Sequence, residues 1–264
     1  MQDDIHFFDC NCAIGRYAVP PMPDLPHTVP QILDALDYSG IDSAIAYHLA
    51  AWEYDPESGN GFLMEELGDE PRVLPQWVIL PHHTGEFAPP RELLDTMVSK
   101  GVLTARMFPS EKAAPPEEAG HNFSLKNWSA GPLLSEMQER RMPLFIARSQ
   151  VSWDQVHDLC TAYPALPLIL TSAPQLCFRA NRHLWPLWSI HENLYVDTSE
   201  NQETARIERV VESFGPERLL FGTGLPRFTP GGSVIAVARA DISDEAKKII
   251  AAQNLERLLE GVQR

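Results

Sequence analysis

The chain has 264 residues, of which 44% are hydrophobic, enough for one substantial core. This length is typical of a single α/β barrel, and we predict one domain over residues 1–264. Lysine and arginine number 21 against 36 aspartates and glutamates, a formal net charge of -15. An acidic surface repels phosphate, so the composition argues against nucleic acid and anionic membrane as partners and favours small molecules or copies of the chain.

The start of the chain and its cysteines indicate where the protein resides. The sequence begins Met-Gln-Asp-Asp, without the basic and apolar regions of a signal peptide. No apolar run approaches the roughly 20 residues that span a bilayer. The four cysteines lack the paired C-x-x-C spacing of a zinc site and are too few for a disulfide scaffold. We therefore expect a cytoplasmic protein with reduced thiols and without membrane contact.

The first half of the chain alternates between strand and helix patterns. Strands are predicted over 5–9, 42–48, 73–80 and 102–108, and helices over 28–38, 62–67 and 91–100. Thr28 is a typical N-cap for the first helix, and Gly40 ends it. The proline-rich stretch 20–30 is a loop, because proline removes backbone donors. The polar insertion 109–124 is either an active-site loop or a solvated loop.

The same alternation continues to the end of the chain. Strands are predicted over 143–147, 167–171, 194–197 and 219–221, and helices over 128–140, 152–163, 181–192, 204–214 and 246–259. Strict strand-then-helix order implies parallel strands, in an open doubly wound sheet or a closed barrel. No G-x-G-x-x-G or G-K-[ST] loop follows the first strand, and eight units favour a (β/α)8 TIM barrel. Functional groups should then lie past the C-terminal ends of the strands.

Several segments resemble the amidohydrolase-related branch of the amidohydrolase superfamily. Residues 8–15 (FDCNCAIG) resemble its opening D-x-H-x-H-x-G, residues 143–148 (PLFIAR) its P-V-x-I-H-T, and residues 218–226 (RLLFGTGLP) its R-L-L-F-G-T-D-x-P. Residues 167–172 and 193–199 are similar to its sixth and seventh strands, and residues 254–259 to its close. The resemblance implies an amidohydrolase-like barrel.

The family's metal ligands are replaced in this sequence. Residues without ligand chemistry, or with weak donors, stand at the aligned positions: Asn11, Ala13, Ala147, Ser172 and Gly224. Zinc and related ions need several imidazole or carboxylate donors, so we expect no metal and no cofactor. A metal site with relocated ligands, such as Asp9, His48 and His83, is the alternative hypothesis.

Strand alternation assigns side chains to the barrel interior or to the helices. If Asn11 points inward, Asp9 shares its face, while Cys10 and Cys12 face the helices. On the second strand, His48 is predicted at the mouth and Tyr47 opposite to it, although a hydrogen-bonded core histidine is equally consistent.

Two charged residues are predicted at the tops of their strands. Arg106 needs an anion, either a structural carboxylate, Asp9 or Asp197, or a substrate carboxylate. Asp197 shares a face with Tyr195 at the end of the seventh strand and would be a structural partner for Arg106.

Residues after the strands supply further candidates. At most one of the adjacent residues His82 and His83 can enter the site, as a general base, or both lie on a loop. Three arginines follow the fifth, sixth and eighth strands, where barrels collect carboxylate or phosphate, although solvated loop arginines are as common. They are Arg148, Arg179 and Arg227. Residues 121–123 form a candidate lid.

These observations lead to two functional hypotheses. The first is a metal-independent hydrolase or lyase of a small anionic, carboxylated substrate. In it His48, His83 and Asp197 are catalytic candidates, and Asn11, Arg106, Arg148, Ser172, Arg179 and Arg227 bind substrate. The second is a non-catalytic relative that binds a metabolite or a protein partner. The helical tryptophans at 128, 153, 185 and 188 are expected to be core or interface anchors, and family members often form dimers, so a homodimer is a further possibility.

Overall fold

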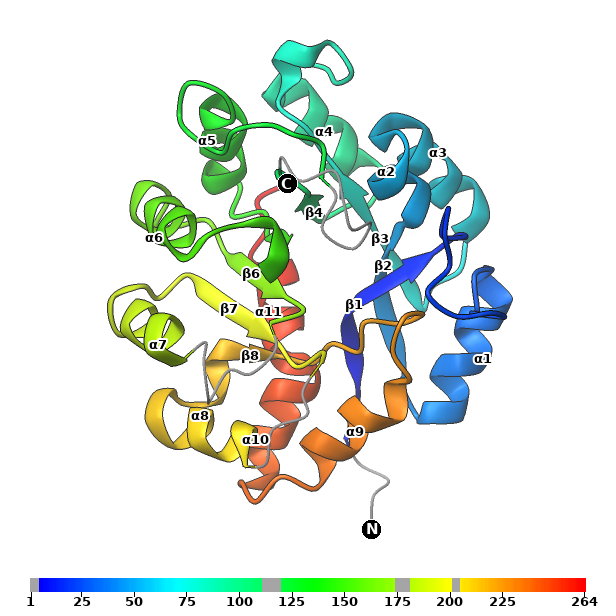
Figure 1. The fold of residues 1–264 in the computed structure, drawn as a ribbon, viewed down its shortest axis with the longest axis vertical. Helices are drawn as coiled ribbons and strands as arrows, with labels where there is room; N and C mark the ends of the chain where they lie inside the picture. The colour runs from blue at the N-terminus through cyan, green and yellow to red at the C-terminus, as the bar shows by residue number, and fades with distance from the viewer. Residues whose placement is uncertain (1–4, 111–119, 174–180, 201–204) are drawn as a thin grey trace.

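Eight parallel strands form one sheet whose spatial order follows the sequence (Figure 1). The computed structural model describes residues 5–110, 120–173, 181–200 and 205–264. The strands are β1 Phe8–Ile14, β2 Ser43–His48, β3 Val73–Val78, β4 Thr104–Met107, β5 Leu144–Ala147, β6 Leu168–Thr171, β7 Leu194–Asp197 and β8 Leu219–Leu220. All eight predicted strands are confirmed, with shifted ends.

The sheet closes on itself between the first strand and the segment that follows the last. Cys10 N donates to Phe221 O at 2.9 Å, and Ala13 N donates to Leu225 O at 2.8 Å. In the other direction, Gly224 N donates to Asn11 O at 2.9 Å. These bonds pair β1 with the segment that directly follows β8, so the protein is a (β/α)8 barrel, as predicted.

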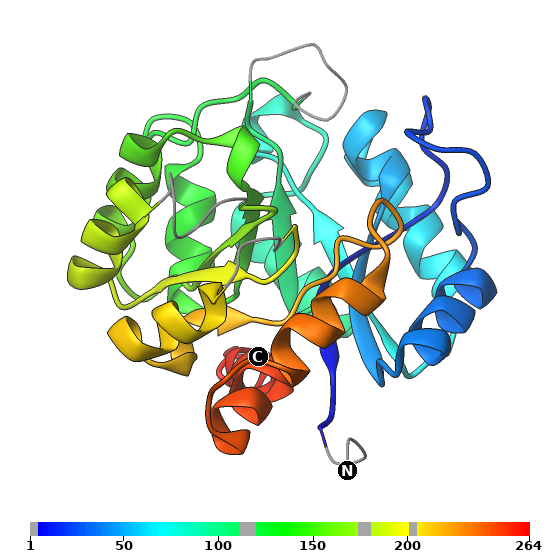
Figure 2. The ribbon, with the colours of Figure 1, turned by 60° about the horizontal axis from the view of Figure 1, so that its bottom comes forward.

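Helices surround the barrel between consecutive strands (Figures 1 and 2). They are α1 Val29–Ser39, α2 Leu49–Glu53, α3 Pro56–Leu67, α4 Pro90–Ser99, α5 Gly131–Glu139, α6 Trp153–Ala162, α7 Asn181–Ile190, α8 Arg206–Phe214, α9 Pro230–Ala238, α10 Asp244–Lys248 and α11 Asn254–Glu260. Thr28 caps α1 and Gly40 ends it with φ 70°, as predicted. No helix within the described ranges is long and apolar enough to cross a membrane.

Two helices have no counterpart in the sequence prediction. The short helix α2 follows β2 without a turn residue between them, so its apolar residues Leu49 and Ala51 continue the strand pattern. Helix α9 begins Pro-Gly-Gly. Because glycine is a poor helix former, this stretch of sequence predicts a loop. Tertiary packing, which buries Val237, overrides that weak propensity.

A bulge in β1 changes which of its side chains face the barrel interior. Asp9 pairs with Ala44 and Cys12 with Ala46, so β1 has one extra residue between these two pairs. Cys10 therefore packs inside with Ile45, and the prediction that it faces the helices is wrong. Cys12 lies in the layer between strands and helices, as predicted.

An apolar cluster fills the end of the barrel at which the strands begin. The inward side chains of five strands meet the C-terminal segment there. In Figure 2 this segment, coloured red, lies beneath the barrel. The cluster comprises Phe8, Cys10, Ile45, Phe145, Ile169, Leu220, Ala252, Leu255 and Leu258. Asn254 fastens this segment by donating from Nδ2 to Leu219 O at 2.8 Å and Pro216 O at 2.9 Å. The N-terminal end is therefore closed, and access to the barrel interior is from the mouth.

Candidate functional site

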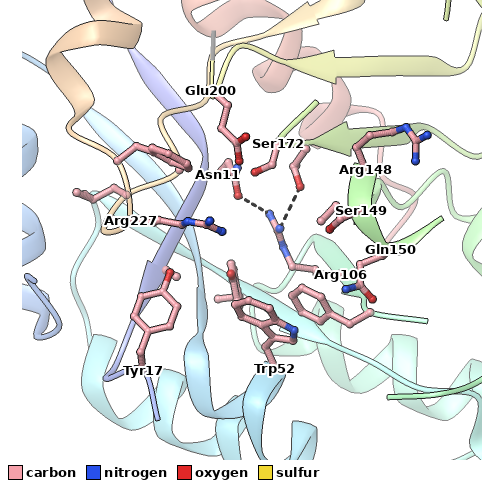
Figure 3. Close-up of a pocket in the computed structure, with 18 of the residues that line it drawn as sticks. Asn11, Tyr17, Trp52, Arg106, Arg148, Ser149, Gln150, Ser172, Glu200 and Arg227 are labelled. Carbon is pink, nitrogen blue, oxygen red and sulfur yellow. Dashed lines mark hydrogen bonds between the residues drawn. The ribbon is translucent and has the colours of Figure 1, made fainter. Parts of the chain in front are cut away.

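A cavity of about 560 Å³ lies at the C-terminal ends of the strands (Figure 3). Residues from β1, β2, β4, β5 and β6, and from the loops after them and after β7 and β8, line it. Its position is the one at which (β/α)8 barrels place their active sites.

Arg106 forms the floor of the cavity and is only 2% exposed. Its Nε donates to Gln76 Oε1 at 2.5 Å, Nη1 to Thr171 Oγ1 at 3.3 Å, and Nη2 to Asn11 Oδ1 at 3.0 Å. Its guanidinium carbon lies 4.4 Å from the centre of the Tyr47 ring, a cation–π contact. Among the described residues, no carboxylate lies within salt-bridge distance of Arg106. The predicted direct pairing with Asp9 or Asp197 is therefore wrong.

Asn11 links Arg106 to a buried carboxylate. While its Oδ1 accepts from Arg106, its Nδ2 donates to Asp197 Oδ2 at 2.9 Å. Asp197 is fully buried behind the cavity wall and also accepts from Ser199 Oγ at 2.7 Å and Ser172 N at 3.0 Å. Burial raises the pKa of Asp197, and these hydrogen bonds lower it in part. The aspartate thus orients Asn11 and the end of β6, and it reaches Arg106 only through Asn11.

Asp9 belongs to a separate buried contact with the last strand. Its carboxylate accepts from Thr223 N at 3.0 Å, from Thr223 Oγ1, and from Asn11 N at 2.9 Å. Burial raises the pKa of Asp9 to about 6, and the hydrogen bonds from Thr223 and Asn11 lower it in part. Its side chain joins β1 to the segment after β8 and is not part of the cavity lining.

A carboxyl group lies on the cavity wall opposite the aromatic side. Glu200 follows β7, and its carboxyl group points into the cavity (Figure 3). It hydrogen-bonds the Ser172 side chain, and Arg227 lies close enough to interact electrostatically. Burial raises the pKa of Glu200, Arg227 lowers it and Asp197 raises it further. A titratable acid therefore lies beside Arg227, in the same cavity as Arg106.

Aromatic rings form the facing wall. Trp52 stacks on Phe108, with ring centres 5.1 Å apart and planes 16° apart, and meets Tyr17 edge-on at 6.4 Å. Tyr47 packs against Phe108 at 5.7 Å. In Figure 3 the rings of Tyr17 and Trp52 lie on the side of the cavity opposite Glu200. A planar, apolar face suits an aromatic or otherwise flat ligand.

A stacked group forms another part of the wall. The Arg148 guanidinium carbon lies 4.0 Å from the centre of the Trp153 ring, and His183 stacks on that ring at 5.5 Å. Arg148 Nη1 also donates to Val151 O, and burial lowers the pKa of the guanidinium. In Figure 3 its guanidinium points away from Arg106. Trp153 packs against the hydrophobic core, as expected, and in addition stacks with Arg148 and His183.

The structure brings most of the predicted binding residues together. Asn11, Arg106, Arg148, Ser172 and Arg227 all line the cavity. Arg179 lies outside the described residues. Sequence reasoning missed Glu200, Tyr17, Tyr47 and Trp52; the position of Glu200, three residues after Asp197 at the end of a strand, was the available signal. Single aromatic residues such as Tyr17 on a loop, Tyr47 on β2 and Trp52 on α2 carry no comparable signal.

The histidine candidates lie elsewhere. His48 faces α3, where its Nε2 lies 3.6 Å from Glu66 Oε1 and its ring meets Phe62 edge-on. Its Nδ1 accepts from Ala50 N at 3.0 Å, which caps α2. On β2, Tyr47 points into the barrel and His48 points toward the helices. The predicted assignment, with His48 inside and Tyr47 outside, is therefore wrong. The core alternative for His48 is the one that the structure supports.

The adjacent histidines His82 and His83 lie in a short helical turn, His82–Thr84, that follows β3. His83 is exposed and lines a separate cavity together with His121. His121 is held in place, because its Nε2 lies 2.9 Å from Trp52 O and its ring meets Phe108 edge-on. His121 thus supports the aromatic wall from behind, and neither histidine reaches the cavity that holds Arg106.

The residues of the cavity do not fit a divalent metal. The five residues that the family resemblance aligns with metal ligands all line it, and they are Asn11, Ala13, Ala147, Ser172 and Gly224. Within the described parts of the chain, no three His, Cys, Asp or Glu side chains are placed to hold an ion. The Arg106 guanidinium, 3.0 Å from Asn11, would repel a cation there. This geometry also opposes a site made from Asp9, His48 and His83.

Gly224 shows that the replacement extends to the backbone. Its φ is 73°, a left-handed conformation that a side chain disfavours, and an added Cβ would lie 2.8 Å from Phe228 Cδ2. A metal-binding aspartate at this position would be strained. The backbone conformation of the loop after β8 therefore favours glycine at position 224 over an aspartate.

Fold and cavity together define a (β/α)8 barrel protein with its site at the mouth. The model of a family described as amidohydrolase matches residues 8–261. The chain belongs to this amidohydrolase family. Comparison with curated proteins gives no match.

Solved structures share the fold at low sequence identity. One is a 5-carboxyvanillate decarboxylase from Novosphingobium aromaticivorans, complexed with manganese and 4-hydroxy-3-methoxy-5-nitrobenzoic acid (TM-score 0.72, 13% identity, 98% of this chain and 97% of that one). Another is a dihydroxybenzoic acid decarboxylase from a Polaromonas species, with bound manganese and 2-nitroresorcinol (0.70, 17%, 97% and 97%). A third is a putative 2-pyrone-4,6-dicarboxylic acid hydrolase from Pseudomonas putida (0.68, 15%, 98% and 99%).

Proposed function

We propose that the protein binds a small, planar carboxylated molecule at the barrel mouth and acts on it as a lyase or hydrolase without a divalent metal centre. The observation that carries this proposal is the state of Arg106. It is a buried cation on the cavity floor, and its described hydrogen-bond partners are all neutral side chains. Burial lowers the pKa of Arg106, and Asp197 and Asp9 act on it only from a distance, without direct contact. A buried charge that no carboxylate contacts is costly, and an anionic ligand in direct contact would reduce that cost.

Arg106 has the donors that a carboxylate requires. A guanidinium carries five N–H groups, and the three described hydrogen bonds use one on each nitrogen. One N–H therefore remains on Nη1 and one on Nη2. A carboxylate can accept both, and such a charge-assisted pair is strong in a partly desolvated site. Gln76, Thr171 and Asn11 hold the guanidinium in place before the ligand arrives.

The remaining walls select the rest of the ligand. The stacked rings of Trp52 and Phe108 present a flat face, and Arg227 adds a second positive charge at the rim. The structural neighbours support the same ligand class, because their names specify decarboxylases of carboxyvanillate and dihydroxybenzoic acid and a hydrolase of a pyrone dicarboxylic acid. We therefore propose aromatic or pyrone carboxylates as the substrate class.

Decarboxylation is the reaction that needs the fewest additional groups. It requires a residue that binds the carboxylate and a residue that donates a proton. In this cavity Arg106 would bind the carboxylate and Glu200 would donate the proton. Hydrolysis would also need a positioned and activated water molecule. We therefore favour a lyase over a hydrolase, because a lyase requires fewer catalytic groups.

Calorimetry with benzoate tests the binding step. We expect Arg106→Met to weaken benzoate binding about tenfold to a hundredfold, because charge-assisted hydrogen bonds contribute about 1.5–3 kcal/mol. The control is Arg209→Met, which removes an exposed arginine from α8 and should leave the affinity unchanged. Equal benzoate affinity in Arg106→Met and the native protein would contradict the proposal.

The second candidate function is a relative that binds a metabolite without transforming it. The loss of all five ligand positions favours this alternative. Incubation with hydroxybenzoates and 2-pyrone-4,6-dicarboxylate separates the two, because binding without CO2 release or ring opening would support the non-catalytic form. The homodimer and the cytoplasmic location remain predictions.

A further inference from the structure

Of the described residues that line the cavity, Glu200 alone carries a carboxyl group. Its carboxyl group points into the cavity from the end of β7, and Asn11 and Ser172 lie beside it (Figure 3). Arg106 projects from β4 on the cavity floor. A ligand whose carboxylate contacts Arg106 would thus have its body between Glu200 and the aromatic wall.

Backbone strain holds Glu200 and its hydrogen-bond partner in place. Glu200 has φ 57° and Ser172 has φ 51°, a left-handed conformation that few residues other than glycine adopt. Ser172 N donates to Asp197 Oδ1 at 3.0 Å and to Ser199 Oγ at 3.2 Å, which fixes its unusual conformation. Such strain is concentrated at functional sites, where the surroundings determine the geometry. Two strained residues that bond each other across β6 and β7 indicate a positioned group.

Charged groups on several sides act on Glu200. Arg227 comes from the loop after β8, Asp197 from the end of β7 and Arg206 from α8, while Ser172 at the end of β6 bonds the carboxyl group. Burial is the main cause that raises the pKa of Glu200. Its neutral form is therefore favoured relative to an exposed glutamate, and its anionic form has Arg227 nearby as a counterion. These properties suit a group that both gives and regains a proton.

From this geometry, and resting on the function proposed above, we infer that Glu200 is the catalytic residue that donates a proton to the bound carboxylated molecule. Ser172 is its positioning residue. In the decarboxylation, the bond between the ring carbon and the carboxylate carbon breaks and CO2 leaves. The electron pair left on the ring carbon takes the proton of Glu200 to form a C–H bond. The resulting Glu200 carboxylate regains a proton from solvent.

Proton uptake on binding tests the inference without requiring turnover. Benzoate places a negative charge near Glu200 and should raise its affinity for a proton, so binding should be accompanied by proton uptake. We would measure the uptake by titrating benzoate in buffers of different ionisation enthalpy across pH 5–8. Native protein should take up a proton in part of this range, and Glu200→Gln should bind benzoate without it. The hydrogen bond from Ser172 stabilises the Glu200 carboxylate and lowers its pKa. Ser172→Ala should therefore retain proton uptake, with its midpoint at a higher pH.

Glu192→Gln is the matched control. Glu192 is exposed and precedes β7, at the end of the strand opposite to Glu200. This variant should show native proton uptake and native turnover. In contrast, Glu200→Gln should lower CO2 release from 2,6-dihydroxybenzoate at least a hundredfold, which is the usual contribution of acid–base catalysis. Its benzoate affinity should remain within threefold of the native value, which also shows that it is folded.

The outcomes separate the two proposals. Failure of native protein to bind benzoate would overturn the proposed function. Normal binding with undiminished proton uptake or CO2 release in Glu200→Gln would overturn the role of Glu200 and leave the binding site intact. Binding without CO2 release by the native protein would overturn decarboxylation and support the non-catalytic alternative.

Discussion

The two ends of the barrel are built from the same strands and have opposite chemistry. At the end where the strands begin, Phe145 and Leu220 belong to an apolar cluster with Leu255 of the C-terminal helix, and the Phe145 ring lies 5.7 Å from the Arg106 guanidinium carbon above it. At the end where they finish, Arg106 and Asp197 are buried within a hydrogen-bond network. Burial of apolar side chains stabilises the first end, whereas desolvation of charges makes the second end costly. The comparison indicates that the apolar packing at the closed end offsets the free-energy cost of burying charged groups at the open end.

The largest expected effect is at the closed end. Phe145→Ala removes a fully buried ring and should lower the free energy of unfolding by about 3–5 kcal/mol. Urea titration followed by far-UV circular dichroism would measure it. Ile235→Ala, which truncates a side chain that is 60% exposed on α9, is the control and should change stability little. A loss below about 1 kcal/mol for Phe145→Ala would refute the role assigned to this cluster.

The next effect concerns pH at the open end. The pKa of Asp9 is raised from 3.8 to about 6, so the folded protein binds this proton more tightly than the unfolded chain. Its contribution to stability is therefore full below pH 3.8 and is lost as pH rises to 6, by about 3 kcal/mol. Asp9→Asn should remove this loss. Urea titrations at pH 4, 5, 6 and 7 would show it, and identical slopes in both proteins would contradict the assignment.

A smaller loss is expected from the residue that links the two buried charges. Asn11→Ala removes partners of Arg106 and Asp197 and should cost about 1–3 kcal/mol, the penalty for unsatisfied buried groups. It should also weaken benzoate binding, because Arg106 loses a support. Asn127→Ala, at an exposed position, is the comparison variant. Chemical denaturation and calorimetry on the same samples would report both effects, and unchanged values in both would argue against the link.

The smallest effect separates two tryptophans. Trp153→Leu removes the ring under Arg148 and should cost about 0.5–1 kcal/mol through the lost cation–π contact, while leucine keeps part of the apolar packing of Trp153 against the core. Trp128 is 80% exposed, so Trp128→Leu should leave stability within about 0.5 kcal/mol of native. Thermal unfolding compares the pair, and an equal effect for both would show that the stack contributes nothing.

Prediction from the sequence succeeded where local patterns are strong. Alternating strand and helix signals, the Thr28 cap and the aligned segments predict the barrel, and the absent ligands at Asn11 and Gly224 follow from the same alignment. Arg106 was placed at the mouth because its strand has regular alternation. His48 was misplaced because both faces of a buried parallel strand are apolar, so alternation alone cannot distinguish inside from outside.

The sequence by itself thus determined the barrel and its order of elements, because periodicity and spacing are local properties. The replacement of the family's metal ligands at positions such as Asn11 and Gly224 followed from the resemblance to that family. Only the tertiary structure decided which groups meet at the mouth. The bulge in β1, the neutral partners of Arg106 and the contact between Ser172 and Glu200 join residues that are 28 to 95 positions apart. Contacts across such separations depend on barrel closure and on competition for buried hydrogen bonds, and no local pattern encodes them.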